Sequence, residues 1–220
     1  MTFSLEWDRC YSENRHNSVW PFSDLVSYVM RHSNVKSKKL RVLELGCGAG
    51  ANVPFFLSLG CDYHGIEGSP IAVKRLRSRF PSIKDRLAIG DFTEALPFSG
   101  KFDLIVDRSS LTHNTTDTIK RGLGLVTSMM RPRARYVGID WFSTQHSEYL
   151  HGVGIDRFTK TGYKDGSFAN VGKVHFSSKE HLRDLFRRFK FLIMEHKVTT
   201  MEIPNQARKS AVWNFVAEKI

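Results

Sequence analysis

From Arg41 onward, short apolar runs alternate with segments of helical period, a pattern typical of parallel α/β sheets. The apolar runs predict strands at 41–45, 62–66, 86–90, 102–107 and 134–141. Helices are predicted at 51–60, closed by Gly60, at 69–81, stopped by Pro81, and at 117–130, before Pro132. Such helices would return the chain to the start of the next parallel strand.

The C-terminal segment predicts one more helix followed by a strand hairpin. Ser177 precedes Glu180 by three residues, which is the spacing of a capping box, and apolar residues then follow at helical intervals. Two apolar runs, 191–200 and 210–220, leave no room between them for a crossover helix. These two strands must therefore run antiparallel to each other, which places one reversed strand in an otherwise parallel sheet.

Two segments lie outside this scheme. The first 40 residues look helical, and we expect 1–40 to form an N-terminal helical cap. Residues 143–175 contain several glycines and no clear period, so they are predicted to be a loop insertion. This loop would emerge at the carboxyl edge of the sheet, where open α/β folds bind ligands. We therefore expect residues 1–220 to form a single domain, with the insertion over the active site.

Composition narrows the functional classes. With 41% hydrophobic and 25% charged residues, the chain resembles a soluble globular protein and not a disordered tail. No apolar run approaches the roughly 18–20 residues that span a bilayer, and the start has no basic segment followed by an apolar one. We therefore expect a cytoplasmic protein without a membrane partner. Cys10, Cys47 and Cys61 form no CxxC pair, so neither a disulfide framework nor a metal site is expected.

Charge adds one further indication. The chain has 33 Lys and Arg against 22 Asp and Glu, and the net charge of +11 favours anionic partners. Basic clusters lie at 36–39, 74–79, 131–135 and 183–190, spread along the chain instead of gathered in one tract. Solvated helix faces explain such clusters more simply than a nucleic-acid surface, which stays as the alternative. The sequence predicts no particular oligomeric state.

A glycine-rich turn follows the first predicted strand. Gly46, Gly48 and Gly50 stand at alternate positions between a strand and a helix, so a ligand can approach the backbone closely there. Gly46, Gly48 and Ala51 also satisfy the GxGxx(G/A) pattern of dinucleotide-binding folds, with Glu67 placed as a ribose-binding acid. The glycines alone do not separate a dinucleotide from other cofactors that bind at such a turn.

Other residues do separate them, because the sequence resembles the class I S-adenosylmethionine-dependent methyltransferases from about residue 40 to 220. The first motif of that family has an acid two places before the first glycine, as in Glu44-Leu-Gly46-Cys-Gly48. The resemblance continues with Glu67 closing the second strand, Gly90-Asp91-Phe92 after the third, the fourth strand at 102–107 and the terminal hairpin. It implies an α/β fold: a three-layer, Rossmann-like, seven-stranded, mostly parallel sheet with a C-terminal antiparallel hairpin strand.

The resemblance also implies S-adenosylmethionine as cofactor and assigns its contacts. Gly46, Gly48 and Asn52 would approach the amino acid part of the cofactor, and Glu44 would act through water or by orienting the turn. Glu67 would accept both ribose hydroxyls through its two carboxylate oxygens. Further along the chain, Asp91 would receive the adenine amino group, Phe92 would pack near the ring, and Asp107 would face the ammonium side.

The methyl acceptor is less constrained by the sequence. His113 follows the fourth strand at the catalytic edge, and a neutral imidazole can accept a proton near pH 7, so it is the candidate general base. Asp107 and Arg108 complete the candidate catalytic group, and Arg108 could pair an anionic group of the substrate.

The Asn-Pro-Pro-Tyr-like tetrapeptide of many amino-directed nucleic acid methyltransferases is absent, because the fourth strand ends Asp107-Arg108-Ser109-Ser110. We also expect no appended RNA-binding domain. Both expectations favour O-methylation of a small molecule, a sugar or metabolite hydroxyl, which could carry an anionic group. An RNA methyltransferase and a non-catalytic cofactor-binding protein are the alternatives.

Overall fold

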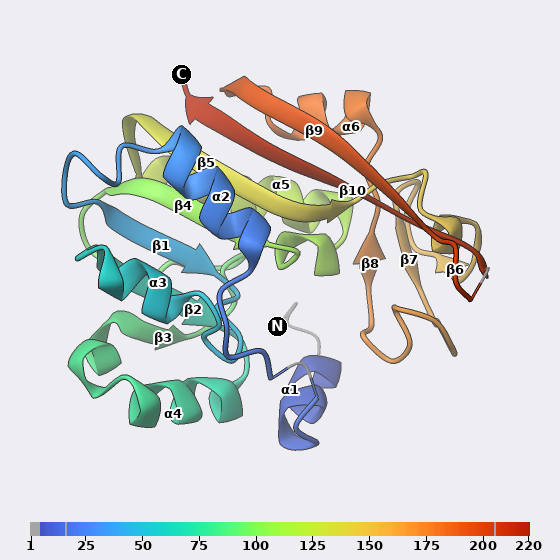
Figure 1. The fold of residues 1–220 in the computed structure, drawn as a ribbon, viewed down its shortest axis with the longest axis horizontal. Coiled ribbons are helices and arrows are strands. Elements are labelled where there is room, and N and C mark those ends of the chain that lie inside the picture. Colours follow the sequence, from blue (N-terminus) through green and yellow to red (C-terminus); the bar gives the residue numbers. More distant parts are fainter. Residues whose placement is uncertain (1–4, 16, 205) are drawn as a thin grey trace.

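A seven-stranded sheet organises the chain (Figure 1). The computed structural model describes residues 5–15, 17–204 and 206–220. The sheet order is β3-β2-β1-β4-β5-β10-β9. These strands are β1 (Arg41–Leu45), β2 (Asp62–Glu67), β3 (Leu87–Ile89), β4 (Phe102–Arg108), β5 (Met130–Phe142), β9 (Phe189–Met201) and β10 (Gln206–Lys219). Strands β1 to β5 pair in parallel, and β10 runs antiparallel to both β5 and β9. The predicted fold class, including the reversed strand, is confirmed.

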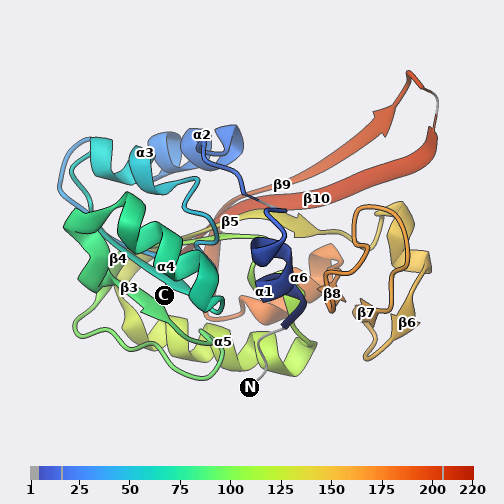
Figure 2. The same ribbon diagram turned by 90° about the horizontal axis from the view of Figure 1, so that it is seen from below.

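Helices cover both faces of this sheet and give it three layers (Figure 2). One face packs against α2 (Ser23–His32), α3 (Val53–Ser58) and α4 (Pro70–Arg79), and the other against α5 (Thr116–Met129) and α6 (Lys179–Leu185). Alternate residues of β1 supply the two cores: Val42 joins the first cluster, while Leu43 and Leu45 join the second. No helix in the described part of the chain is long and apolar enough to cross a membrane.

The N-terminal segment does not act as one cap. Helix α2 packs on the sheet beside β5, whereas the short α1 (Leu5–Ser12) lies against α4 near the carboxyl ends of the strands. The side chain of Ser69, which begins α4, donates a hydrogen bond to Asp8 over 2.5 Å, and Arg75 donates to the carbonyl of Tyr11 over 2.8 Å. Within the described residues of 1–40, α1 and the segment between α1 and α2, with Ser18 and Phe22, therefore line the site, whereas α2 itself does not.

Residues 143–175 form more structure than the predicted loop. They contain the turn η3 (Ser147–Leu150) and the strands β6 (Val153–Gly154), β7 (Thr159–Thr161) and β8 (Val174–His175), which pair as a small antiparallel sheet. This insert has its own apolar cluster, in which Tyr163, Phe168, Val171 and Val174 are buried together with the adjacent Phe176. Strands of two or three residues carry no detectable period, so the sequence pattern did not reveal them.

Several predicted boundaries need correction, and β5 begins at Met130 instead of at residue 134. Helix α6 has Ser178 as its N-cap, accepting the amide N–H of His181 over 3.2 Å, and not Ser177. Ser177 is fully buried, and its backbone N–H donates to the carbonyl of Phe142 over 2.8 Å, which ties it to the end of β5. The terminal strands are longer than predicted, so β9 and β10 project from the body as a two-stranded ribbon (Figure 2). Asn205, between these two strands, lies outside the described residues.

Candidate functional site

A cavity of about 710 Å³ opens at the carboxyl edge of the sheet. The turn after β1 forms its floor, and α1 and the insert approach it from two other sides (Figure 1). Nine of the ten predicted site residues line it, namely Glu44, Gly46, Gly48, Asn52, Glu67, Asp91, Phe92, Arg108 and His113. Residues far apart in the sequence are thus brought together where the resemblance placed the cofactor.

The glycine turn has no space for side chains. Gly46 and Gly48 adopt φ values of +60° and +52°, which L side chains rarely adopt. A Cβ on Gly46 would collide with the side chain of Ser110, and one on Gly48 would lie 2.7 Å from the hydroxyl of Tyr11. The bare backbone of the turn therefore faces the cavity at the point where a ligand can approach it.

Glu44 is a buried carboxylate beneath this turn. It accepts hydrogen bonds from the amide of Asn52 over 2.8 Å and from the hydroxyl of Tyr63 over 2.6 Å. Burial raises the pKa of Glu44 to about 7, although both hydrogen bonds lower it. The carbonyl oxygen of the Asn52 side chain accepts the backbone N–H of Phe22 over 3.2 Å, so Asn52 joins the turn to the segment that enters α2.

Glu67 closes β2 and holds the same turn from the other side. One carboxylate oxygen accepts the N–H of Gly48 over 2.9 Å, and the other accepts the N–H of Ser69 over 3.0 Å. Burial raises its pKa, and these backbone hydrogen bonds oppose the shift. A carboxylate oxygen can accept more than one hydrogen bond, so both oxygens keep capacity for ligand hydroxyls.

Asp91 and Phe92 follow β3 at the far end of the cavity. One oxygen of Asp91 accepts hydrogen bonds from the backbone N–H of Thr93 over 2.9 Å and from its hydroxyl over 2.6 Å. The Phe92 ring reaches back toward the turn and would lie 3.6 Å from a Cβ on Gly46. This end of the cavity therefore combines a carboxylate with an aromatic face.

Asp107 is placed differently from the prediction. It is fully buried and does not line the cavity. Its oxygens accept hydrogen bonds from the Tyr136 hydroxyl over 2.9 Å and from the Ser110 N–H over 2.8 Å, and burial raises its pKa to about 6. The side chain thus points under the loop that follows β4 and shapes that loop, instead of facing a ligand.

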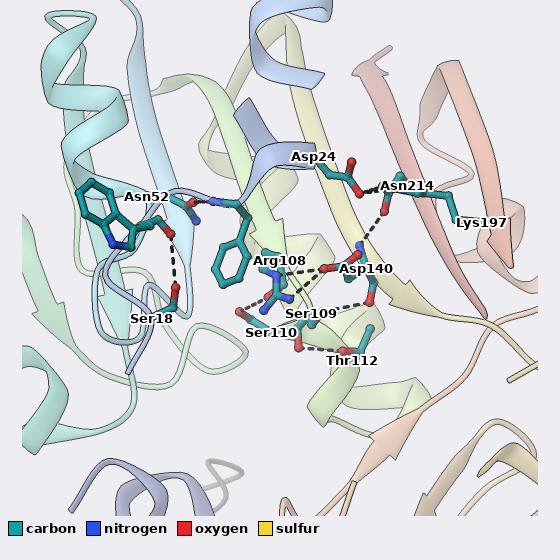
Figure 3. A network of polar contacts seen from close by, with 12 residues as sticks. Ser18, Asp24, Asn52, Arg108, Ser109, Ser110, Thr112, Asp140, Lys197 and Asn214 are labelled. Carbon is teal, nitrogen blue, oxygen red and sulfur yellow. Dashed lines mark hydrogen bonds and ion pairs between the residues drawn. The ribbon is translucent and has the colours of Figure 1, made fainter. Parts of the chain in front are cut away.

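An ion pair at the opposite end of the cavity joins the ends of β4 and β5 (Figure 3). Two N–H groups of Arg108 meet one oxygen of Asp140 at 3.0 Å, and the guanidinium lies 3.6 Å from the centre of the Phe22 ring. Both Ser109 and Asp140 have φ of +56°, an uncommon conformation for residues other than glycine. The Ser109 hydroxyl donates to the Asp140 carbonyl over 2.9 Å, which locks the two strand ends together.

A buried amide supports this strained arrangement from behind. The side chain of Asn214, fully buried in β10, accepts the N–H of Asp140 over 2.8 Å and donates to Asp24 over 3.1 Å. Asp24 in turn pairs with Lys197 of β9, which also lines the cavity (Figure 3). Both cations at this end of the cavity, Arg108 and Lys197, are therefore paired with carboxylates.

His113 faces the cavity from the turn after β4. Its Nδ1 lies 2.9 Å from the carbonyl oxygen of Lys173 in the insert. A carbonyl oxygen can only accept, so Nδ1 carries the proton and Nε2 is the basic nitrogen of the neutral ring. The ring also packs edge-on against Trp7, with centroids 4.8 Å apart, and against Phe142 at 5.8 Å.

Several lining residues were missed by the sequence reasoning. Trp7 and Tyr11 come from α1, and Phe168 and Val171 from the insert. No motif marks them, and only the unassigned segments that contain them indicated that the cavity would be covered. Asp140 lies at the end of the predicted fifth strand, and no motif gives it a role.

Comparison with known proteins identifies the domain. Residues 42–141 match the model of a family described as methyltransferase domain. These residues, a little under half of the chain, are therefore similar to methyltransferase domains. This match supports the resemblance to class I S-adenosylmethionine-dependent methyltransferases, with the enzyme class and the cofactor that the resemblance implies. No match was found among curated protein sequences.

Solved structures agree with this methyltransferase fold at low identity. A methyltransferase from Methanosarcina mazei is 19% identical, with a TM-score of 0.69 over 88% of this chain and 98% of that one. The glycopeptide N-methyltransferase MtfA, complexed with S-adenosyl-L-homocysteine, is 17% identical, with a TM-score of 0.62 over 93% and 92%. Magnesium protoporphyrin IX methyltransferase from Synechocystis, with bound cofactor, is 12% identical, with a TM-score of 0.55 over 98% and 81%.

The Glu44 carboxyl generates a pH prediction. Its pKa rises from the ordinary 4.5 to about 7 on folding, so between these values the unfolded chain releases a proton that the folded chain keeps. Stability should therefore fall as pH rises through this window, by roughly 2–3 kcal/mol from this group. Glu44→Gln cannot ionise and should lack that loss.

Urea unfolding of both proteins between pH 4.5 and 8 measures the effect. The difference between their unfolding free energies should change across the window in favour of the variant. Glu67 and Asp107 titrate in both proteins and largely cancel. Two parallel stability curves would show that Glu44 ionises normally in the folded state.

Proposed function

We propose that the protein transfers the methyl group of S-adenosylmethionine to a hydroxyl of a small molecule, a sugar or another metabolite. The observation that carries this proposal is that the cavity is covered from two sides. Trp7 and Tyr11 of α1 approach from one side, and Phe168 and Val171 of the insert from the other. A volume of about 710 Å³ lies within the range of small-ligand pockets and has to hold both cofactor and acceptor.

The residues present fit the cofactor. The turn at Gly46 and Gly48 excludes side chains, as close approach of the amino acid part requires, and Asn52 acts by holding Glu44 in place. Glu67 would accept the ribose hydroxyls with oxygens that the Gly48 and Ser69 amides already orient. When bound, S-adenosylmethionine supplies a methyl carbon activated by a positive sulfonium.

The adenine end and the loop after β4 complete this assignment. Asp91 would receive the adenine amino group, and Phe92 would pack against the ring. Asp107 supports the site indirectly, because its hydrogen bonds with Ser110 and Tyr136 fix the loop that carries Arg108 and His113.

The acceptor would lie between His113 and the Arg108–Asp140 pair. His113 would take the proton of the acceptor hydroxyl at Nε2, since the Lys173 carbonyl fixes the tautomer. Phe142, in contact with His113, gives this region an apolar wall. Arg108 already donates two N–H groups to Asp140, so an anionic group on the acceptor would have to bind its remaining N–H groups.

The cofactor assignment predicts the effect of Glu67→Ala. Loss of the carboxylate should weaken S-adenosylmethionine binding by at least about 1.4 kcal/mol, a tenfold change in dissociation constant. Calorimetric titration measures it, with Glu180→Ala, an exposed acid of α6, as the control. An unchanged dissociation constant in Glu67→Ala would remove the ribose assignment, and binding of NAD by the wild type would argue for a dinucleotide site.

The proposed reaction is tested with a panel of acceptors. The protein is incubated with S-adenosylmethionine and sugars, nucleotide sugars, hydroxylated metabolites or RNA, and release of S-adenosylhomocysteine is followed. Turnover is expected with a hydroxylated small molecule and not with RNA. Cofactor binding without turnover on the whole panel would instead support a non-catalytic binding protein, and turnover on RNA alone would support the alternative substrate.

The base assignment predicts the behaviour of His113→Ala. Turnover should fall at least about tenfold, at the low end for loss of a general base, while cofactor affinity stays unchanged. His151→Ala, at an exposed histidine of the insert, is the matched control. Wild-type turnover across the pH range in His113→Ala would exclude His113 as the base.

A further inference from the structure

Basic side chains gather at the edge of the sheet opposite the cavity. Each helix returns the chain to the amino ends of the parallel strands. Three basic segments lie just before or at the start of β1, β5 and β9, and therefore at this same end of the sheet: 36–39, 131–135 and 187–190 (Figure 1). We call these three segments the basic edge. The scattered clusters of the sequence thus become neighbours in the fold.

The carboxylates at this edge do not neutralise it, because each is shared by two cations. Asp103 lies 3.1 Å from Lys38 and 2.9 Å from Arg131, and Glu218 lies 3.7 Å from Arg133 and 3.9 Å from Arg135. One carboxylate balances one cation, so each group keeps a net positive charge.

Other cations of the basic edge have no acidic partner at all. The side chains of Lys36, Lys39, Arg187, Arg188 and Lys190 are exposed, and none forms an ion pair in the described part of the chain. Phe189 lies among the last three but is buried in the second core, which keeps this segment firmly positioned.

We infer that the basic edge is a docking surface for double-stranded nucleic acid, bound through its phosphates. Strands in a sheet lie about 4.8 Å apart, so the order β1-β4-β5-β10-β9 spaces the cations along a ridge of roughly 19 Å. A duplex carries one negative charge per about 1.7 Å of its axis and offers phosphates along such a ridge.

The surroundings favour a duplex over other polyanions. Single strands are held by stacking on aromatic rings, and among the described residues the exposed large aromatic side chain is Trp20, which precedes α2 and not a strand of the basic edge. Membrane surfaces are usually bound with apolar side chains as well. Among the described residues, two exposed large apolar side chains, Leu192 and Ile220, lie near the basic edge, and most of the others lie on the ribbon tip and the insert.

This surface is separate from the catalytic site and does not depend on the proposed function. The basic edge lies at the amino ends of the parallel strands, and the cavity lies at their carboxyl ends. Strand β4, with seven residues, sets them roughly 20 Å apart. A duplex on the basic edge is therefore not the methyl acceptor.

Fluorescence anisotropy with a labelled 16-base-pair duplex tests the inference. The triple variant Arg187→Gln, Arg188→Gln, Lys190→Gln should weaken binding at least about tenfold at low salt. The slope of log affinity against log salt should shrink by up to about 2.7, or about 0.9 for each lost phosphate contact. The matched control Lys74→Gln, Lys164→Gln, Lys179→Gln removes the same charge from exposed sites elsewhere and should bind nearly as the wild type.

Three results would overturn the inference: no duplex binding by the wild type, equal loss in both triple variants, or binding of phosphatidylserine vesicles but not of duplex. Titration of S-adenosylmethionine with and without duplex checks the separation from the cavity. Unchanged cofactor affinity is expected, and competition or methylation of the duplex would place the nucleic acid at the catalytic edge instead. Failure of the acceptor panel would leave these readouts unaffected.

Discussion

The hydrogen bond between Asn52 and the buried Glu44 carboxylate is the contact on which the rest of the site depends. Among the described residues, no ion pair involves Glu44; it is held by the neutral donors Asn52 and Tyr63. The Asn52 side chain also accepts the backbone N–H of Phe22, and the Phe22 ring lies against Arg108. A series of contacts thus links the glycine turn to the Arg108–Asp140 pair.

The parts of the site that the sequence could predict are those formed by neighbouring residues. The glycine turn and the acids at strand ends are local features, because a strand, a turn and a helix follow each other within a few residues. Nine of the ten predicted residues line the cavity for this reason. Asp107 differs because the direction of its side chain is decided by Tyr136 on the neighbouring strand, a contact between positions far apart in the sequence.

The parts that could not be predicted depend on tertiary contacts. The insert is stabilised by its own small apolar cluster and by the bond from the Thr116 N–H to Asp156 over 2.9 Å, neither of which has a periodic signature. The start of α6 shifts by one residue because Ser177 is held by the end of β5. The net charge did not reveal where the cations lie, because only the strand order shows that they gather away from the cavity.

The strained backbone at Ser109 and Asp140 is also maintained by contacts with residues far away in the sequence. A left-handed conformation at Ser109 and Asp140 costs of order 1–3 kcal/mol each and persists only where the surroundings enforce it. Asn214 enforces it from β10, and Asp24 holds Asn214 from α2. Because Asp140 carries the carboxylate that fixes Arg108, relaxing the backbone would move the ion pair off the cavity wall. The reversed strand that supplies Asn214 therefore supports the Arg108–Asp140 pair at the cavity wall as well as the fold.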